Sequence, residues 1–512
     1  MRRTSRLLVA SLLAFGAAVP AATASELVVG FTRDADTLDP ANHRKRETET
    51  IIRNMYDGIL TRDSDMNILP ELAVSYTQVS PTVYEFKIRD GVTFHDGSAM
   101  TAEDVKFTLE RLTAEGGMGD GQTSPRKSLL GPLSGVEVVD GSTVRVTLSE
   151  PWPLLPAMLP FQEVVSKAFV EKVGTEGMAT QANGTGPFKL VEWRKGDSII
   201  MERFDGYYGG APGIEPADKA CVDRVIFKII PESASRVAAL LSGDVHIINE
   251  LPPFSVEQVK NSPNADVVTV NGTRSFFIAL NTQGEIFDDL RVRQAVAHAI
   301  DKNLIIDKIL GGNAESIAGI LSPDAFGKND NLPEYAYDPD KARALLAEAG
   351  YPDGIEVTMD TEGAFKDTAE AIASLLTRAG IKTQVTVGEG ALLSQKWRTK
   401  GGEKTGDMFF TSWGNGSLDP EGIFVPTHVT AARGNSAGYS NPEIDKLLTE
   451  AATEVDREKR AAMYQQAEAI ANADLPYVYL WVPQDIYGVS KRLSGWTPSA
   501  DSRINLHDAC LK

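Results

Sequence analysis

Positive charge is scarce in this sequence of 512 residues, because 51 Lys and Arg stand against 70 Asp and Glu and the formal net charge is −19. Without an overall basic field, the chain is not attracted to nucleic acid or to anionic lipid, so we expect no nucleic-acid partner. Long hydrophobic runs are missing beyond the N-terminus, where no segment approaches the roughly eighteen apolar residues of a membrane-spanning helix. The composition predicts a soluble protein of two or three domains.

Cysteine and histidine, which build many metal sites and nucleophilic centres, are also few. The chain has 2 Cys and 6 His, and the histidines are scattered singly, whereas metal sites use clustered ligands. No Gly-x-Ser-x-Gly elbow is present, and the glycine-rich segment 116–121 lacks the lysine of a phosphate-binding loop. We therefore expect no metal, no cofactor and no catalytic centre.

The N-terminal segment has the pattern of a secretory signal peptide. Arg2, Arg3 and Arg6 precede an apolar run over 7–19, and Ala22-Thr23-Ala24 supplies the small residues that signal peptidase requires. Cleavage after Ala24 would remove three arginines and no acidic residue, which changes the net charge from −19 to −22. No cysteine lies near this site to carry a lipid, so we expect a freely diffusing exported protein.

The two cysteines, Cys221 and Cys510, both lie in the predicted mature chain. Disulfides persist in the compartments to which exported proteins are delivered, so we predict that the two form one disulfide. The alternative is two separately buried thiols.

Local patterns predict the elements of an α/β protein. The apolar segment 27–31 is typical of a buried strand. Apolar alternation and Asp-Gly turns predict strands at 84–88 and 92–94 and a hairpin over 136–148, and a capping box begins a helix at Thr101. Helical spacing and Asx-Pro starts predict helices over 291–306, from 338 to 350 and from 441. The short apolar runs at 355–359, 382–387 and 408–410 lie between helices, which is typical of βαβ units with a parallel sheet.

One long segment resembles a known family signature. Residues 84–97, Tyr-Glu-Phe-Lys-Ile-Arg-Asp-Gly-Val-Thr-Phe-His-Asp-Gly, are similar to the signature of family 5 extracellular solute-binding proteins, the peptide, nickel and opine class that serves bacterial ABC importers. Further segments resemble the family in the family's order: Tyr56-Asp57-Gly58, 184–188, Pro231-Glu232 with Arg236 and Gly243-Asp244, 291–295 with 299–301, and 441–445. The resemblance covers essentially the whole mature chain.

The resemblance implies a type II, two-lobed periplasmic binding protein of the large class, whose lobes close on a solute. Lobe I would be discontinuous, formed by 25–57, 182–272 and 482–512; an extra inserted domain would take 58–181, and lobe II would take 273–481. The implied partners are a small peptide or peptide-like solute and the membrane permease and ATPase subunits of the importer. We expect a periplasmic monomer.

The predicted solute site departs from the peptide-binding pattern of the family. In peptide-binding members, a Trp-x-x-Asp segment of lobe II presents an acid to the ammonium group of the peptide. The matching segment here runs from Trp413 through Asn415 to Pro420, and Gly416 replaces the acid. Asp419 stands next to the proline, where a turn cap is the favoured interpretation. The departure puts the ordinary dipeptide mode in doubt.

A second departure lies at Arg44-Lys45-Arg46, where family members bring lobe I residues to the ligand. Arginines there suit a carboxylate or phosphate, although a solvated charge run balanced by Glu47 and Glu49 is the alternative. Trp397 resembles an aromatic of the cleft wall, as does Trp413, and either could be core. The predicted ligand-binding residues are Arg44, Arg46, Trp397, Trp413, Asn415 and Gly416.

Three functions remain open from the sequence. The first is a peptide-import receptor, and the second is a receptor in the same fold for a non-peptide anionic solute such as an opine or a phosphorylated or carboxylated conjugate. The third is a periplasmic hydrolase, which the missing nucleophile and base disfavour.

Overall fold

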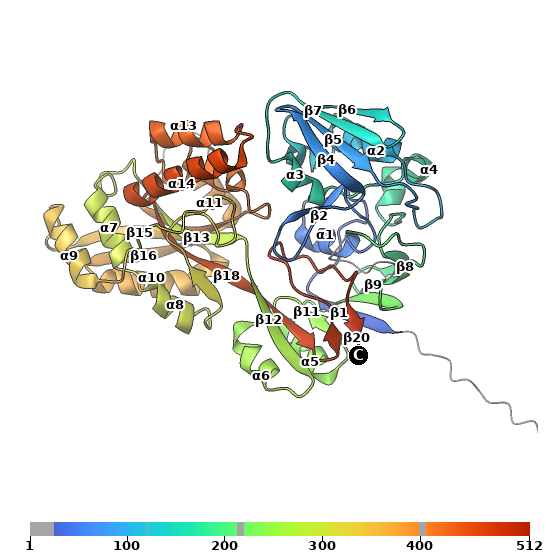
Figure 1. Ribbon diagram of the computed structural model, residues 1–512. Helices are drawn as coiled ribbons and strands as arrows, with labels where there is room; N and C mark the ends of the chain where they lie inside the picture. The colour runs from blue at the N-terminus through green and yellow to red at the C-terminus, as the bar shows by residue number, and fades with distance from the viewer. Residues whose placement is uncertain (1–24, 120, 212–219, 399–405) are drawn as a thin grey trace, which may run out of the picture.

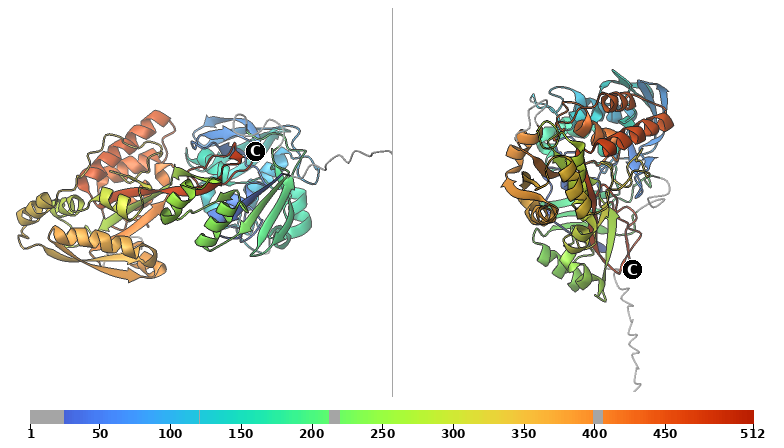
Figure 2. Two further views of the ribbon diagram at one scale, coloured as in Figure 1. Left: turned by 90° about the horizontal axis from the view of Figure 1, so that it is seen from below. Right: turned by 90° about the vertical axis from the view of Figure 1, so that its left-hand side faces the viewer.

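The computed structural model describes residues 25–119, 121–211, 220–398 and 406–512, and these residues form two lobes (Figure 1). The predicted signal peptide, residues 1–24, lies outside the described residues. One strand, β18 (Tyr477–Ser490), passes from one lobe into the other (Figure 2). Its first part pairs with β13 (Arg274–Leu280), and its last part pairs with β12 (Ala265–Asn271). The two-lobed α/β fold is confirmed.

Lobe I is built on a mixed sheet in the order β11-β1-β10-β9-β8. The predicted strand at 27–31 is β1, and it pairs in parallel with β10. Apolar residues of the sheet lie in two buried clusters, so both of its faces are covered. The elements are β1 (Glu26–Phe31), α1 (Arg46–Ile52), β8 (Phe188–Arg194), β9 (Ser198–Arg203), β10 (Arg224–Ile229), α5 (Ser233–Ser242), β11 (Ile247–Ile248), η3 (Pro253–Ser255) and α6 (Val256–Lys260).

A disulfide joins Cys221 to Cys510 within lobe I, with the two Cα atoms 5.1 Å apart. The predicted pairing is confirmed. It ties β20 (Cys510–Leu511), which pairs with β19 (Leu493–Ser494), to the segment that precedes β10.

A smaller unit packs beside lobe I, and we call it the insert. It contains a four-stranded antiparallel sheet in the order β4-β5-β7-β6, with α2 packed against it. Its elements are β2 (Leu60–Arg62), β3 (Ile68–Pro70), β4 (Ala73–Ser80), β5 (Val83–Ile88), α2 (Ala102–Thr113), η1 (Lys127–Leu130), β6 (Leu133–Asp140), β7 (Thr143–Leu148), α3 (Leu155–Met158) and η2 (Leu159–Phe161). The predicted hairpin and the capping box of α2 are confirmed.

One feature of this region differs from the prediction. Val92 and Phe94 are buried in the core of the insert, but their segment forms only an isolated bridge from Thr93 to Ala99, because Phe94 closes a tight turn with Ser98. The predicted strand at 92–94 is therefore wrong. The helix α4 (Lys167–Met178) places apolar residues in the core of lobe I and not in that of the insert.

Lobe II is a sheet with helices on both faces. Alternate residues of β13 lie in two different buried clusters, one with α7, α8, α9 and α10 and the other with α11, α12, α13 and α14. The predicted parallel pairing is confirmed, because β15 pairs in parallel with both β16 and β17. The elements are α7 (Leu290–His298), α8 (Lys302–Lys308), β14 (Ala314–Ser316), α9 (Pro339–Glu348), β15 (Ile355–Glu362), η4 (Gly363–Phe365), α10 (Lys366–Arg378), β16 (Ile381–Gly388), α11 (Gly390–Arg398), β17 (Met408–Gly414), η5 (Pro420–Gly422), α12 (Phe424–His428), α13 (Pro442–Ala451) and α14 (Arg457–Asp474).

The predicted helix over 291–306 is in fact two helices. The first, α7, ends at His298, and Asp301 caps α8 by accepting a hydrogen bond of 2.9 Å from the backbone N–H of Leu304. Helical spacing of apolar residues continues across the break, which is why the sequence predicted a single helix.

Among the described residues, none of the helices has the length and hydrophobicity needed to cross a membrane. The same part of the chain contains no group of three or more His, Cys, Asp or Glu placed to hold a metal ion.

Candidate ligand-binding cleft

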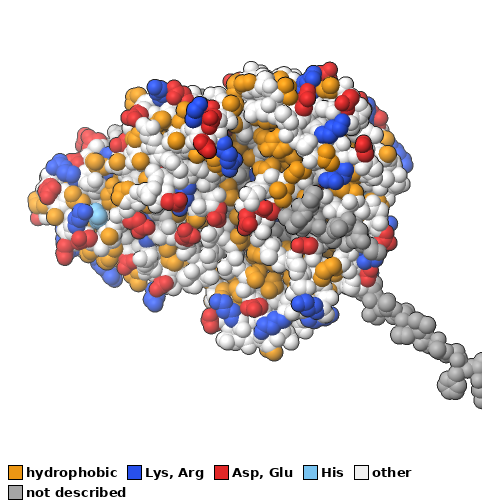
Figure 3. Space-filling view, viewed as in Figure 1, with side chains coloured by type: hydrophobic (Ala, Val, Ile, Leu, Met, Phe, Trp, Pro, Cys, Tyr) orange, Lys and Arg blue, Asp and Glu red, His pale blue; other side chains and the backbone are white. Residues whose placement is uncertain are grey.

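A cavity of about 590 Å³ lies between the two lobes. Figure 3 shows the groove between them, with apolar and basic side chains on its walls. Lobe I supplies the loop before α1 and the first turns of that helix, and the insert supplies residues between 126 and 161. Lobe II supplies the start of β13 and the segment that follows β17. The cavity is thus formed only where the lobes meet, as a closing receptor requires.

Five of the six predicted binding residues line this cavity: Arg44, Arg46, Trp413, Asn415 and Gly416. The sixth, Trp397, does not. It is fully buried, stacks on Phe409 at 5.5 Å between ring centroids, and donates a hydrogen bond of 2.7 Å from Nε1 to Asp360. The helix α11 turns this side chain towards the core of lobe II, so Trp397 is a core residue and its prediction as a ligand contact is wrong.

Arginine dominates the walls of the cavity. Six arginines line it, and three acidic residues accompany them: Arg44, Arg46, Arg126, Arg274, Arg398 and Arg433, with Glu49, Glu421 and Asp501. Two of the six, Arg44 and Arg46, are predicted from the sequence. The other four come from separate elements and carry no local motif, so no sequence pattern marks them.

Two of the acidic residues are already committed to ion pairs within lobe I and the insert. Glu49 lies 3.6 Å from Arg126 and 3.7 Å from Arg503. Asp501 lies 2.6 Å from Arg503 and 3.7 Å from Arg62. Although burial favours the neutral carboxyl, these guanidinium groups lower the pKa of Asp501 to about 2.

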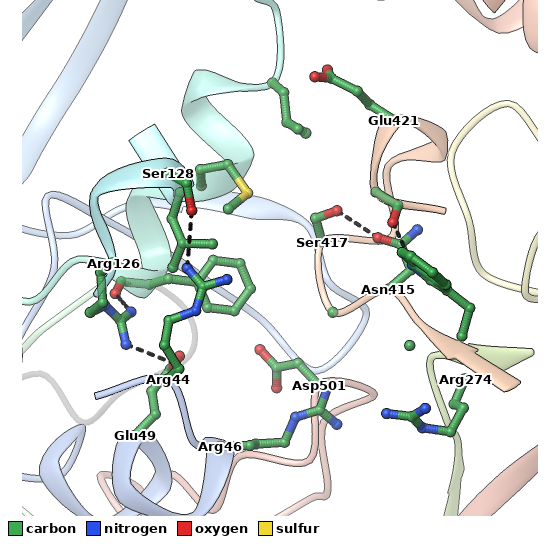
Figure 4. A pocket seen from close by; sticks show the side chains of 18 of the residues that line it. Arg44, Arg46, Glu49, Arg126, Ser128, Arg274, Asn415, Ser417, Glu421 and Asp501 are labelled. Atoms are coloured by element: carbon green, nitrogen blue, oxygen red, sulfur yellow. Dashed lines mark hydrogen bonds and ion pairs between the residues drawn. The ribbon is translucent and has the colours of Figure 1, made fainter. Parts of the chain in front are cut away.

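The remaining five arginines have no carboxylate within 4 Å among the described residues. Their hydrogen-bond acceptors are neutral. Arg46 donates to Ser502 Oγ at 2.8 Å, and Arg274 donates to Ser412 Oγ at 3.2 Å. Arg44 donates to Ser128 Oγ at 3.4 Å, as the dashed line in Figure 4 marks. The cleft therefore carries five guanidinium groups that form no ion pair with a described residue, in a protein that is acidic overall.

Trp413 holds two of these arginines. The guanidinium groups of Arg398 and Arg433 lie 5.2 Å and 5.1 Å from the centroid of its indole ring, within the range of a cation–π contact. The indole Nε1 of Trp413 donates to the carbonyl of Gly422 at 2.9 Å. Arg398 also donates to Thr411 Oγ1 at 2.9 Å. Trp413 is half-buried, and its indole ring makes cation–π contacts with both guanidinium groups.

Gly416 and Arg46 occupy one region of the cleft. A Cβ atom at position 416 would lie 3.3 Å from Nη2 of Arg46, and the carbonyl of Gly416 accepts a hydrogen bond of 3.0 Å from Arg62. An arginine of lobe I therefore stands beside Gly416, the position where the resemblance to peptide-binding proteins leads one to expect an acid.

Asp419 does not face the cavity as a free carboxylate. It accepts hydrogen bonds of 2.6 Å and 2.7 Å from Arg460, and it caps η5 through the backbone N–H of Glu421 at 3.1 Å. The turn-cap interpretation of Asp419 is therefore correct.

The charge run at Arg44-Lys45-Arg46 is not balanced by its neighbours in sequence. Lys45 pairs with Asp36 at 2.9 Å, and Glu47 lies 3.9 Å from Arg33. Neither Arg44 nor Arg46 shares in these pairs. Glu47 and Glu49 therefore form no ion pair with this run among the described residues, although Arg44, Lys45 and Arg46 are all exposed to solvent.

Comparison with known proteins shows similarity along nearly the whole chain. The sequence profile of the bacterial extracellular solute-binding proteins, family 5 Middle, matches residues 67–435. The chain is 28% identical over 517 residues to the glutathione-binding protein GsiB of Pectobacterium atrosepticum, covering 99% of this chain and 98% of that protein.

Two solved structures are 28% identical to the chain. One is the ABC transporter-associated periplasmic binding protein DppA of Helicobacter pylori in complex with the peptide STSA, with a TM-score of 0.75 and coverage of 95% of this chain and 98% of that one. The other is the binding protein AgaA of A. tumefaciens R10 in complex with agropinic acid, with a TM-score of 0.71 and coverage of 95% and 99%.

Proposed function

The chain belongs to the bacterial extracellular solute-binding proteins of family 5, and we propose that it captures an anionic, peptide-like solute in the arginine-lined cleft. Membership makes the protein a solute receptor of an ABC importer and not an enzyme, so the hydrolase hypothesis is wrong. The importer's permease and ATPase subunits are its implied partners. The identity of the solute is the proposal.

The observation that carries this proposal is the set of five arginines without a carboxylate partner. They come from both lobes and line one cavity of about 590 Å³. A guanidinium group binds a carboxylate or phosphate through two parallel hydrogen bonds, and such charge-assisted bonds are the strong ones. Arginines already held by neutral hydroxyl and carbonyl oxygens have lost part of their side-chain freedom, so binding an anion costs them less conformational entropy.

A peptide-like skeleton is supported by the similarity to the glutathione-binding protein over nearly the full length of both chains. Gly416 supplies no carboxylate for an α-ammonium group, and Arg46 stands beside it. We therefore propose a solute in which carboxylates, and not a free amine, make the main charged contacts. Peptides that rely on a free amine for their main charged contact are expected to bind poorly.

A second candidate is a non-peptide anion of the opine class. The similarity to the structure that contains agropinic acid favours it, and that structure is as similar in sequence to this chain as the peptide complex is. Both candidates use the same arginines.

The test is calorimetric titration of purified, ligand-free protein with glutathione, agropinic acid, a neutral dipeptide and its N-acetylated form. Binding of an anionic member with loss of affinity in Arg274→Gln supports the proposal. Arg378→Gln is the matched control, because Arg378 is an exposed arginine of α10 that lines none of the described cavities. Tight binding of the plain dipeptide that is insensitive to Arg274→Gln would contradict it.

We also propose that the protein acts as a periplasmic monomer, released by cleavage after Ala24, and that the limits given above for the lobes and the inserted domain hold, except that α4 packs with lobe I. N-terminal sequencing of exported protein tests the cleavage site, and light scattering tests the monomer.

A further inference from the structure

The unpaired arginines of the cleft form two sets that face one another. Arg44 and Arg46 belong to lobe I, whereas Arg274, Arg398 and Arg433 belong to lobe II. Each lobe therefore presents positive charge to the other. Closing the lobes brings like charges together in a space from which water is excluded, and their repulsion grows as the local dielectric constant falls.

Arg46 and Arg274 form the first pair across the cleft. A Cβ atom at Gly414 would lie 3.0 Å from Nη2 of Arg274, and a Cβ atom at Gly416 would lie 3.3 Å from Nη2 of Arg46. The two guanidinium groups therefore pack over positions two residues apart on the same segment. Figure 4 shows them pointing towards one another. Burial, and next the charge of Arg46, lower the pKa of Arg274, whereas Glu362 and Asp485 oppose the shift.

Arg44 of lobe I and Arg433 of lobe II line the same cavity from its two sides, and we take them as the second pair. Both side chains are exposed in the cleft. Among the described residues, Arg44 donates only to Pro125 O at 3.3 Å and to Ser128 Oγ at 3.4 Å, and Arg433 lies over the face of Trp413. Burial lowers the pKa of Arg44, as do the charges of Arg126 and Arg433.

Three acidic residues, Glu362, Asp485 and Asp501, act on the first pair electrostatically, but among the described residues none of them lies within 4 Å of either guanidinium group. Asp501 is bound by Arg503 and Arg62. Asp485 accepts a hydrogen bond from Ser502 Oγ, the same hydroxyl that accepts from Arg46, and burial raises the pKa of Asp485. The hydroxyl therefore separates the Asp485 carboxyl from the guanidinium group of Arg46. No acidic residue lies within 4 Å of either member of the second pair in the described part of the chain.

We propose that this receptor closes only around a solute that carries two anionic groups, one bound between Arg46 and Arg274 and the other between Arg44 and Arg433. The inference rests on the proposed function and deepens it, because it gives the number and placement of the charges on the solute. A solute with a single anionic group leaves one pair of like charges facing each other in the closed cleft. Such a solute binds to the open form and does not hold the lobes together.

The first test needs no solute. Arg433→Glu and Arg274→Glu each replace a repulsive pair by an attractive one, so the ligand-free variants should be more compact than the wild type in small-angle X-ray scattering. Arg433→Gln removes the repulsion without adding attraction and should give an intermediate radius of gyration. Arg378→Glu is the control and should leave the radius unchanged. An unchanged radius in all the cleft variants, with native circular dichroism, would overturn the inference.

The second test counts the anionic groups. Glutathione, its glycine monoethyl ester and its diethyl ester carry two, one and no free carboxylates. Each esterification should weaken binding at least about tenfold, the effect expected for a lost charged hydrogen bond, and only glutathione should decrease the radius of gyration. In Arg433→Gln or Arg274→Gln, esterification of the carboxylate that the lost arginine binds should change the affinity little.

The two proposals fail in different ways. If neither glutathione nor agropinic acid binds, the proposed ligand class is wrong, and the charge-reversal variants still decide whether like charges keep the cleft open. If the monoethyl ester binds as tightly as glutathione and closes the lobes equally, the requirement for two anionic groups is wrong while an anionic solute remains correct.

Discussion

Position 416 and Arg46 together determine the charge of one region of the cleft. Arg46 comes from the first turn of α1 in lobe I, and its guanidinium group lies where a side chain at 416 would extend from lobe II. An acid at 416 would pair with this arginine, whereas the glycine leaves it for the solute. The loss of the acid and the presence of the arginine are therefore two parts of one arrangement.

Gly416→Asp is expected to weaken binding of an anionic solute by about 1.5–3 kcal/mol, because the new carboxylate competes for Arg46. The contact at 3.3 Å is with the flexible end of a side chain, so the substitution should be tolerated sterically. Gly416→Asn is the matched control of the same size without charge. Calorimetry that finds equal losses in the two variants would show a steric and not an electrostatic effect. Peptides with a free amine should bind relatively better to the Asp variant.

Arg44→Ala and Arg46→Ala should each weaken binding of an anionic solute by about 1.5–3 kcal/mol per lost charged hydrogen bond. Both side chains are exposed and have no carboxylate partner, so thermal stability should change little. Calorimetry and thermal denaturation measure the two effects separately. Full affinity in both variants would favour the plain peptide-receptor hypothesis. A large loss of thermal stability would show that the substituted arginine has a structural role.

Two tryptophans show what sequence can and cannot predict at this scale. Trp397 and Trp413 both resemble cleft residues, and both are aromatic residues in lobe II. The first is fully buried beside Phe409, while the second lines the cavity. The difference depends on which face of α11 meets the sheet and on where β17 ends. The residue type encodes neither the orientation of α11 nor the end of β17. The sequence therefore could not distinguish the core tryptophan, Trp397, from the cavity tryptophan, Trp413.

At the scale of elements, local chemistry predicted most of the fold. Caps and Asx-Pro starts located α2, α9 and α13, an apolar segment located β1, and alternation located β5 and the β6–β7 hairpin. Predictions were wrong where tertiary contacts decide, at the break between α7 and α8 and at Val92–Phe94. The same limit applies to the cleft: Arg126, Arg274, Arg398 and Arg433 lie on elements that only the tertiary fold brings together.

The disulfide lies within lobe I, so its removal should affect stability and not closure. Loop-closure entropy gives a stabilisation on the order of 5 kcal/mol for so long a loop. Cys221→Ser combined with Cys510→Ser should lower the midpoint of chemical denaturation while leaving solute affinity nearly unchanged. Reduction of wild-type protein should have the same effect. A double variant of normal stability would contradict the expectation. A variant of normal stability that had lost solute affinity would show that the disulfide takes part in lobe closure.

At the scale of the whole molecule, β18 joins the two lobes and contributes to their cores. Trp481 lies in a core of lobe II, and Tyr487 lies in a core of lobe I. Because the strand is anchored in both sheets, we expect the lobes to move as rigid bodies about its middle, where its pairing changes from β13 and β14 to β12. The resulting motion would open and close the cavity that contains the arginines.

Hydrogen bonds already join the insert to lobe II across the cleft, one of them from Arg62 to the carbonyl of Gly416 at 3.0 Å. Trp152 of the insert donates from Nε1 to Glu421 of lobe II at 2.9 Å. Burial raises the pKa of Glu421 to about 7, and the nearby Asp419 and Glu150 raise it further, whereas Trp152 and Arg460 oppose the shift. Opening of the lobes would expose Glu421 to water and return its pKa towards the ordinary value of 4.5.

The contact between the lobes should therefore depend on pH. Because the pKa of Glu421 is higher when the contact is made, the contact is fully favoured below about 4.5 and is weakened as the pH rises through about 7. The ligand-free protein should accordingly become less compact between pH 5.5 and 8.5 in small-angle scattering. Glu421→Gln keeps the hydrogen-bond acceptor but cannot ionise, so its radius of gyration should stay constant over this range. Trp152→Phe removes the donor and should open the protein at every pH. Equal pH dependence in wild type and Glu421→Gln would assign the change to another titrating group and exclude Glu421 as its origin.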